Sequence, residues 1–206
     1  MKQPDICYIV GAGEDYGLDF VPKEGDLVIA ADGGLARLQN TGICPDLIIG
    51  DFDSLGHVPQ EDHVLVLPTV KDVTDTWAAI RQGQERGYSR FWLYGCTGGR
   101  IDHTIANIQT AAELAEQGME CRIVDKTQII TALSGGEMEF APSCKGFLSV
   151  FSHTDVCRGV TLEGLKYELR DAELTNRFPL GVSNEFLGKP ARVTIGEGIA
   201  VLVYER

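Results

Sequence analysis

Short apolar runs alternate with longer amphipathic stretches over the first 124 residues of the chain. The apolar runs end at glycine, proline or aspartate, which is typical of buried strands followed by turns. The stretches between them repeat apolar residues at helical intervals of three and four. This alternation indicates an α/β domain with a mainly parallel sheet. The predicted strands cover residues 5–10, 27–31, 48–50, 64–67, 90–94 and 121–124.

Three helices are predicted between these strands. The first covers residues 35–42, and the second begins after Thr74, a favourable N-cap residue, and ends at Gly87. The third begins at residue 101 and is closed by Gly118. Its predicted buried stripe consists of Ile101, Ile105, Ile108, Ala112 and Ala115.

From residue 128 onward the pattern changes to short β-forming runs separated by glycine, proline and polar turns. No amphipathic helix pattern interrupts them, which predicts an antiparallel sandwich or barrel-like module. The tripeptide Ser134-Gly135-Gly136 is predicted to be an early turn. The predicted strands cover residues 128–133, 137–140, 147–151, 165–169, 192–195 and 199–204.

The two patterns predict two domains. We expect a Rossmann-like α/β domain with a mainly parallel sheet over residues 1–127 and an all-β sandwich over residues 128–206. No run approaches the roughly 18 apolar residues of a membrane span. The N-terminus lacks the apolar core of a signal peptide. These features predict a cytoplasmic protein with no membrane partner.

Charge and cysteine content narrow the possible functions. The net charge is −12, from 18 basic and 30 acidic side chains, which disfavours a nucleic-acid partner because phosphate backbones are bound by basic clusters. The six cysteines are scattered without a Cys-x-x-Cys pair, which argues against zinc and against a disulfide framework. Cys96 lies in a glycine-rich loop near a possible site. The sequence shows no evident base beside it, so Cys96 is not expected to be a catalytic nucleophile.

Carboxylates follow two of the predicted strands. Asp51 and Asp53 come directly after Gly50, and Asp32 follows the strand at 27–31. Two carboxylates held this close repel each other unless a cation lies between them, and magnesium prefers such oxygen ligands together with phosphates. The carboxyl edge of an α/β sheet is where ligands bind, so these residues predict a metal-nucleotide site. In the alternative, Asp51 caps a turn, Asp53 is solvated and Asp32 is a helix N-cap.

The start of the second helix adds two candidates. Asp75 lies in its first turn, where the helix dipole stabilises a carboxylate, and Lys71 precedes the helix and can reach a phosphate. Alternatively, Asp75 satisfies only the helix-start amides and Lys71 is solvated.

Two glycine loops are candidates for contact with phosphate. Gly11-Ala12-Gly13 follows the first strand, but Tyr16 stands where a dinucleotide fingerprint needs its third glycine. Gly98-Gly99-Arg100 leads into the third helix, whose free amides suit an anion, and Asp102 and His103 follow at the same helix start. The alternative is that Arg100 only pairs with Asp102, which caps the helix.

One polar pair stands out in the second half. Ser183 and Asn184 offer a hydroxyl and an amide, the groups that recognise a small polar heterocycle. Both residue types also form turns, so an ordinary turn is the rival interpretation.

The ordered set of these motifs resembles the thiamine pyrophosphokinase family. The motifs that carry the resemblance are Asp32-Gly33-Gly34, Gly50-Asp51-Phe52-Asp53-Ser54, Lys71-Asp72-Val73-Thr74-Asp75, Gly98-Gly99-Arg100-Ile101-Asp102-His103 and Gly181-Val182-Ser183-Asn184. The resemblance implies an N-terminal domain that binds ATP with magnesium and a C-terminal β-sandwich that helps bind thiamine. It also implies a homodimer in which both subunits contribute to the thiamine cleft.

The resemblance implies a role for each candidate residue. Asp51, Asp53 and Asp75 would hold magnesium, with Asp32 beside them on metal or nucleotide, and these four are the candidate catalytic residues. The candidate ATP ligands are Lys71, Thr74, Gly98, Gly99, Arg100 and Asp102. The candidate thiamine ligands are Ser183, Asn184, Asp102 and His103.

The implied reaction transfers the β,γ-diphosphoryl group of ATP to the hydroxyl of thiamine and yields thiamine diphosphate and AMP. Three alternatives remain from the residues themselves. These are a diphosphokinase for a pterin alcohol, a non-catalytic nucleotide or thiamine sensor, and a metal-dependent sugar transferase with an Asp-x-Asp motif, which the other motifs disfavour.

Overall fold

The structure of the 206-residue chain is a computed structural model that describes residues 5–52, 63–68 and 72–206. The chain divides into two compact units. The first comprises residues 1–107 and 123–125, and the second comprises residues 108–122 and 126–206. The predicted division at residue 127 stays a prediction.

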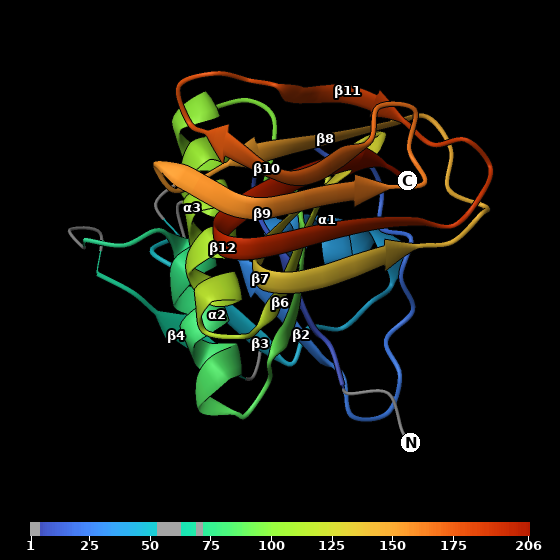
Figure 1. Cartoon of the computed structure of the whole chain (residues 1–206). Helices are drawn as coiled ribbons and strands as arrows, with labels where there is room; N and C mark the ends of the chain where they lie inside the picture. The colour runs from blue at the N-terminus through green and yellow to red at the C-terminus, as the bar shows by residue number, and fades with distance from the viewer. Residues whose placement is uncertain (1–4, 53–62, 69–71) are drawn as a thin grey trace. The chain divides into compact units, whose positions relative to one another are not determined.

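The described part of the first unit contains a parallel sheet with the strand order β5-β1-β2-β3-β4. Of these strands, β2, β3 and β4 are labelled in Figure 1. Every residue of β1, β2 and β3 is buried, as expected where both faces of a parallel sheet are covered. The predicted strands are therefore present, with small shifts at their ends. Their bounds are β1 Cys7–Val10, β2 Leu27–Ala31, β3 Leu47–Gly50, β4 Val64–Val66 and β5 Arg90–Tyr94.

Three helices lie within the described ranges: α1 Gly34–Thr41, α2 Asp75–Glu85 and α3 Ile101–Glu116. The predicted N-cap of α2 is confirmed, because the Thr74 hydroxyl accepts a hydrogen bond from the Trp77 N–H at 3.1 Å. Strand β6, Glu120–Val124, follows α3. None of these helices is long and apolar enough to cross a bilayer.

The predicted packing face of α3 is partly wrong. Ile101 and Ile105 are 76% and 52% exposed, although Ala112 and Ala115 are buried as expected. The buried face also includes Asn107, Ala111 and Leu114. Three alanines together with Asn107 and Leu114, rather than Ile101 and Ile105, therefore form the face on which this helix packs.

The strands of the second unit after residue 126 are antiparallel, and no helix lies among them in the described chain. Strand β12 pairs with β7, β8 and β9, while β9 also pairs with β10 and β8 with β11. Buried side chains of β8, β9, β10 and β12 form one core. The bounds are β7 Gln128–Phe140, β8 Phe147–Ser152, β9 Val156–Glu163, β10 Leu169–Thr175, β11 Gly181–Glu185 and β12 Ala191–Glu205.

Two long strands replace four predicted short ones. Strand β7 continues through the predicted turn at 134–136, and β12 covers both predicted runs at 192–195 and 199–204. The pairing of β12 with β7 shifts register between Ile195 and Ile199. Glycine inside a strand often marks such a bulge rather than a turn. Strand β9 was not predicted, and β10 begins only where the predicted 165–169 strand ends.

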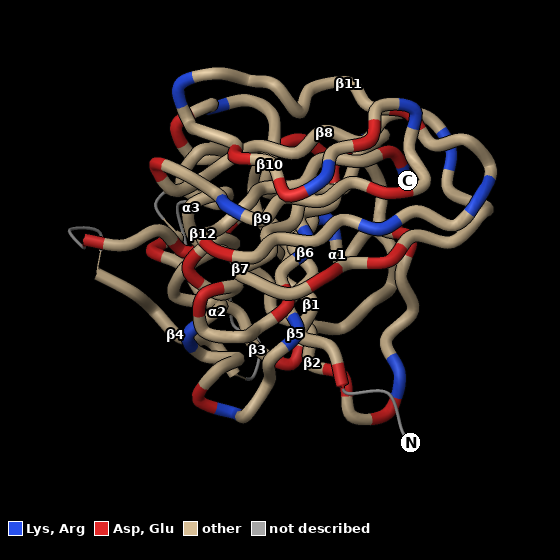
Figure 2. The backbone as a smooth tube through the Cα atoms, viewed as in Figure 1, with Lys and Arg blue, Asp and Glu red and all other residues tan. Residues whose placement is uncertain are grey.

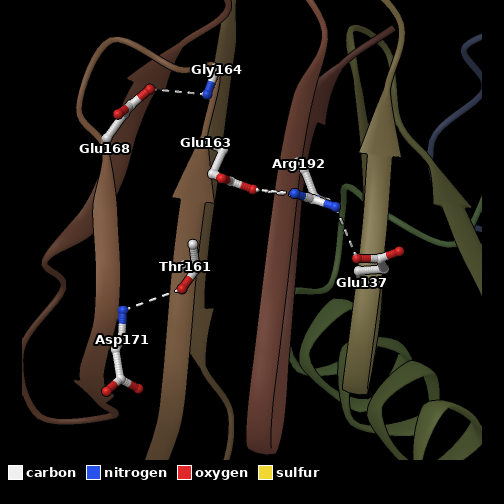
Figure 3. A network of polar contacts seen from close by, with 7 residues as sticks. All are labelled: Glu137, Thr161, Glu163, Gly164, Glu168, Asp171 and Arg192. Carbon is white, nitrogen blue, oxygen red and sulfur yellow. Dashed lines mark hydrogen bonds and ion pairs between the residues drawn. The ribbon is translucent and has the colours of Figure 1, made fainter.

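Opposite charges pair across the solvent face of these strands. Arg192 on β12 lies 2.7 Å from a carboxylate oxygen of Glu163 on β9 and 3.4 Å from one of Glu137 on β7 (Figure 3). Lysine and arginine positions are scattered among acidic ones in both units (Figure 2). Exposed pairs of this kind contribute little stability but favour one register.

We expect Gly34→Ala to destabilise the protein by about 1–3 kcal/mol, because an added Cβ would collide with the Val10 carbonyl oxygen. Urea unfolding followed by circular dichroism measures the change. Gly42→Asn is the matched control, since Gly42 has a φ of 72° that asparagine tolerates and no atom lies within 4 Å of the position that a Cβ would take there. Equal stability of the two variants would contradict this packing role.

Candidate functional site

A cavity of about 380 Å³ lies in the first unit. Its walls come from the segments that follow β1, β2 and β5 and from the beginnings of α2 and α3. Seven of the predicted site residues therefore meet in one place. The lining residues are Ala12, Gly13, Glu14, Ala31, Asp32, Thr74, Asp75, Thr76, Gly95, Cys96, Gly98, Gly99, Arg100, His103 and Asn107.

The strand order explains the position of this cavity. Strand β1 has β2 on one side and β5 on the other, because the chain adds β2, β3 and β4 on one side of β1 and then returns to add β5 on the other. In open α/β sheets this switch point, at the carboxyl ends of the strands, is the usual ligand crevice.

The loops after β1 and β5 are joined directly by backbone hydrogen bonds. The amides of Gly11, Gly13 and Glu14 donate to the carbonyls of Tyr94, Gly95 and Thr97 at 2.8, 2.7 and 2.9 Å, respectively. A Cβ at Gly13 would lie 2.6 Å from the Gly95 oxygen, so only glycine fits. The glycines of the first loop therefore allow contact between two loops, and together these loops form one cavity wall.

Two helix N-termini open into the cavity. Thr74, Asp75 and Thr76 belong to the start of α2, and Gly98, Gly99 and Arg100 precede α3. Helix N-termini present free amides and a partial positive charge, which favour phosphate. The carboxylates of Asp32, Asp75 and Glu14 line the same space. This combination suits a phosphate group that arrives with a cation.

Asp32 has the left-handed φ of 50°, and its N–H donates to the Ile49 carbonyl at 2.7 Å. A Cβ at Gly50 would lie 3.2 Å from the Cα of Asp32, so the ends of β2 and β3 are in contact. The N-cap interpretation of Asp32 is wrong, because the N-cap residue of α1 is Gly33 and no side-chain hydrogen bond caps this helix. Gly34 packs against β1, so its small size serves the fold.

Three of the four predicted metal ligands, Asp32, Asp51 and Asp75, lie within the described residues. Asp51 follows Gly50 and is half-buried, but it is not among the residues that line the cavity. Asp53 and Lys71 lie outside the described residues. Within the ranges that are described, no three His, Cys, Asp or Glu side chains are grouped closely enough to hold a metal ion.

Arg100 and Asp102 form an exposed ion pair at 2.6 Å, which is the pairing that the alternative interpretation expected. The hydrogen bond from Arg100 lowers the pKa of the Asp102 carboxyl. Arg100 and His103 line the cavity, whereas Asp102 does not. Contact of Asp102 with ATP or thiamine stays a prediction.

Ser183 and Asn184 lie on β11 of the second unit, so the turn interpretation is wrong. The Asn184 side chain is buried, accepts from the Tyr167 N–H at 2.9 Å and donates to the Tyr167 carbonyl at 2.7 Å. This amide therefore holds the segment before β10 in place. Ser183 is exposed, with a φ of 57°.

Three polar residues of the cavity were not predicted as site residues: Glu14, Thr76 and Asn107. Cys96, which was expected near a site, also lines the cavity. Asn107 is buried and donates to the Cys96 carbonyl at 2.8 Å. Its spacing of four residues from His103 is a helical signal that could have identified it. Burial raises the pKa of the Cys96 thiol to about 12, which agrees with the expectation that Cys96 is not a nucleophile.

Two family models match this chain. The catalytic domain of thiamin pyrophosphokinase matches residues 21–123, and its vitamin B1 binding domain matches residues 137–200. The chain belongs to the thiamine pyrophosphokinase family. The predicted enzyme class is thereby confirmed, and with it ATP-dependent diphosphoryl transfer to thiamine, giving thiamine diphosphate.

Individual relatives agree with this membership. The chain is 28% identical over 187 residues to thiamine pyrophosphokinase of Bacillus subtilis (strain 168), covering 87% of each chain. The crystal structure of the enzyme from Bacillus subtilis superposes with a TM-score of 0.84 at 26% identity, covering 98% of this chain and 99% of the other. That of thiamin pyrophosphokinase from Geobacillus thermodenitrificans gives 0.83 at 26% identity, covering 98% and 97%.

We expect iodoacetamide at pH 8 to alkylate Cys44 and to leave Cys96 unmodified in the folded protein. Cys44 is exposed, whereas Cys96 is buried and its pKa of about 12 leaves almost no thiolate at this pH. Peptide mass spectrometry measures both sites, and alkylation in urea is the control in which both react. Equal labelling rates in the folded protein would show that the cavity wall is open.

Proposed function

We propose that the cavity of the first unit is the ATP site of this thiamine diphosphokinase. The observation that carries the proposal is the convergence of two helix N-termini with Asp32 and Asp75 around one cavity. The amides at the start of α3, together with Arg100 and Lys71, would bind the phosphates. Thr74 both caps α2 and faces the cavity, so its position is held by the fold.

Magnesium fits the chemistry of these residues. The ion usually takes one or two carboxylates, and its remaining ligands are waters and substrate phosphates. Asp32 and Asp75 supply two oxygen donors at the cavity, and Asp51 and Asp53 are the proposed additional ligands. When bound, magnesium would offset the negative charge that builds on the phosphate oxygens.

The reaction needs positioning more than covalent chemistry by the protein. The thiamine hydroxyl attacks the β-phosphorus in line, the bond from this phosphorus to the oxygen shared with the α-phosphate breaks, and AMP leaves. Amide donors and Arg100 would stabilise charge on the transferred group. Asp75 and Asp102 are the two proposed groups that would accept the hydroxyl proton, and the hydrogen bond from Arg100 lowers the pKa of the Asp102 carboxyl.

The second unit would supply the thiamine contacts. Ser183 offers an exposed hydroxyl, while Asn184 would act by holding Tyr167 and its neighbours in position. On the cavity side, His103 and Asp102 are the proposed thiamine-facing residues. Binding of the cationic thiazolium would be favoured by the acidic net charge of −12.

The finer assignments belong to the same proposal. We infer a Rossmann-like domain over residues 1–127, supported by the parallel strands of the first unit, and a β-sandwich over residues 128–206. The sandwich is supported by β12, whose first half pairs with β9 and whose second half pairs with β8. A cytoplasmic homodimer with shared active sites stays a prediction.

We expect incubation with ATP, magnesium and thiamine to yield thiamine diphosphate and AMP in equal amounts. Mass spectrometry of the products measures this directly, with a pterin alcohol as the control acceptor. EDTA is expected to abolish the reaction, and added Mg²⁺ to restore it. Tight binding of thiamine without turnover would instead identify a sensor.

We expect Asp32→Asn and Asp75→Asn each to lower kcat by about 10²–10³-fold, because each removes charge beside the proposed phosphate site. Asparagine tolerates the left-handed backbone of residue 32, so the fold should persist. Glu85→Gln, at the opposite end of α2, is the matched control and should keep wild-type kcat. Wild-type activity in both aspartate variants, with circular dichroism unchanged, would refute the site.

A further inference from the structure

Arg37 on α1 holds the loop that follows β1. Its Nη1 donates to the carbonyl oxygens of Gly11 at 2.8 Å and Glu14 at 3.4 Å, and its Nη2 donates to that of Gly13. One half-buried guanidinium therefore binds three carbonyls within four consecutive residues. A planar fork of N–H donors suits this arrangement, whereas a lysine ammonium does not.

The loop that Arg37 holds is a wall of the cavity. Residues 12–14 line the cavity, and the same loop is hydrogen-bonded to the segment after β5. A Cβ added at Gly95 would collide with Nη1 of Arg37, so the guanidinium also touches this second segment. Arg37 therefore lies behind the wall and contacts both of its halves without being a lining residue.

Among the described residues, Arg37 forms no ion pair with a carboxylate. Its hydrogen bonds there all go to carbonyl oxygens. A guanidinium stays charged at all relevant pH values. Its field also reaches the lining residue Cys96, where it opposes the rise in thiol pKa caused by burial. A cation thus stands behind the wall of a cavity that carries several carboxylates.

We infer that Arg37 is a positioning residue for the ATP phosphates, which it serves by clamping the cavity wall and by adding positive charge behind it. The inference rests on the proposed ATP site. It assigns Arg37 to the ATP phosphates, because the wall it holds is hydrogen-bonded to the segment after β5, which leads into the start of α3, where the proposed phosphate-binding amides lie.

The test compares Arg37→Met, which removes the charge and the donors, with Arg37→Lys, which keeps the charge but loses the fork. We expect Arg37→Met to raise the KM for ATP about tenfold or more and to lower kcat, because small displacements of positioning groups are costly. The KM for thiamine should stay within about twofold of wild type, because the displacement is confined to the wall that Arg37 holds. Arg37→Lys should recover part of the lost ATP affinity.

A second readout does not depend on activity. The rate at which iodoacetamide alkylates Cys96 should rise about tenfold in Arg37→Met, because the loosened wall exposes this thiol. Arg81→Met on α2 is the matched control, since Arg81 is exposed and donates a hydrogen bond to Gln84 of the same helix at 3.0 Å. This control should change neither the KM for ATP nor the labelling of Cys96.

The outcomes separate this inference from the proposed function. Lack of thiamine diphosphate formation by the wild-type protein would refute the function, while Cys96 labelling would still decide whether Arg37 clamps the wall. Unchanged KM for ATP and unchanged labelling in Arg37→Met would overturn the inference. If Arg37→Met does not fold, Arg37→Lys decides: equal changes in KM for ATP and thiamine would show a merely structural role and overturn it.

Discussion

The contact between two loop backbones is the constraint on which the candidate site depends. The segments after β1 and β5 lie so close that amides of the first segment donate hydrogen bonds to carbonyls of the second. A side chain at Gly13 would prevent this close approach. Parallel pairing of β1 with β5 brings the segments together. Because buried backbone groups must be paired, this hydrogen bonding gives the cavity a wall of defined shape.

The electrostatics of the cavity follow from the same sheet. Strands end and helices begin at one edge, so carboxylates such as Asp32 and Asp75 meet the positive ends of α2 and α3. Neither the carboxylates alone nor the positive helix ends alone would bind both a phosphate and its cation. In the proposed site, the carboxylates would attract the cation, and the helix amides together with Arg37 behind the wall would favour the anion. The site therefore matches a pair of opposite charges rather than a single ion.

The second unit shows how far local patterns can mislead. Glycines at 135 and 136 have φ angles of 61° and 81° and resemble a turn in the sequence, yet β7 passes through them. The neighbouring strand β12 shifts register nearby, so the glycines accommodate a bend in a continuous pair of strands. Asn184 illustrates the same point, because its amide serves the backbone of Tyr167, which is distant in sequence.

The sequence by itself determined the strands of the first unit, the Thr74 cap and the ordered motifs that identify the family, since these depend on local hydrophobicity, local hydrogen bonds and residue order. Only the tertiary structure decided that Asn107, Leu114 and the alanines form the buried face of α3, that Gly34 packs against Val10 and that Arg37 binds three carbonyls about 25 residues away. Such contacts join segments that no local period connects. They exist only after the parallel sheet has brought its strand ends together.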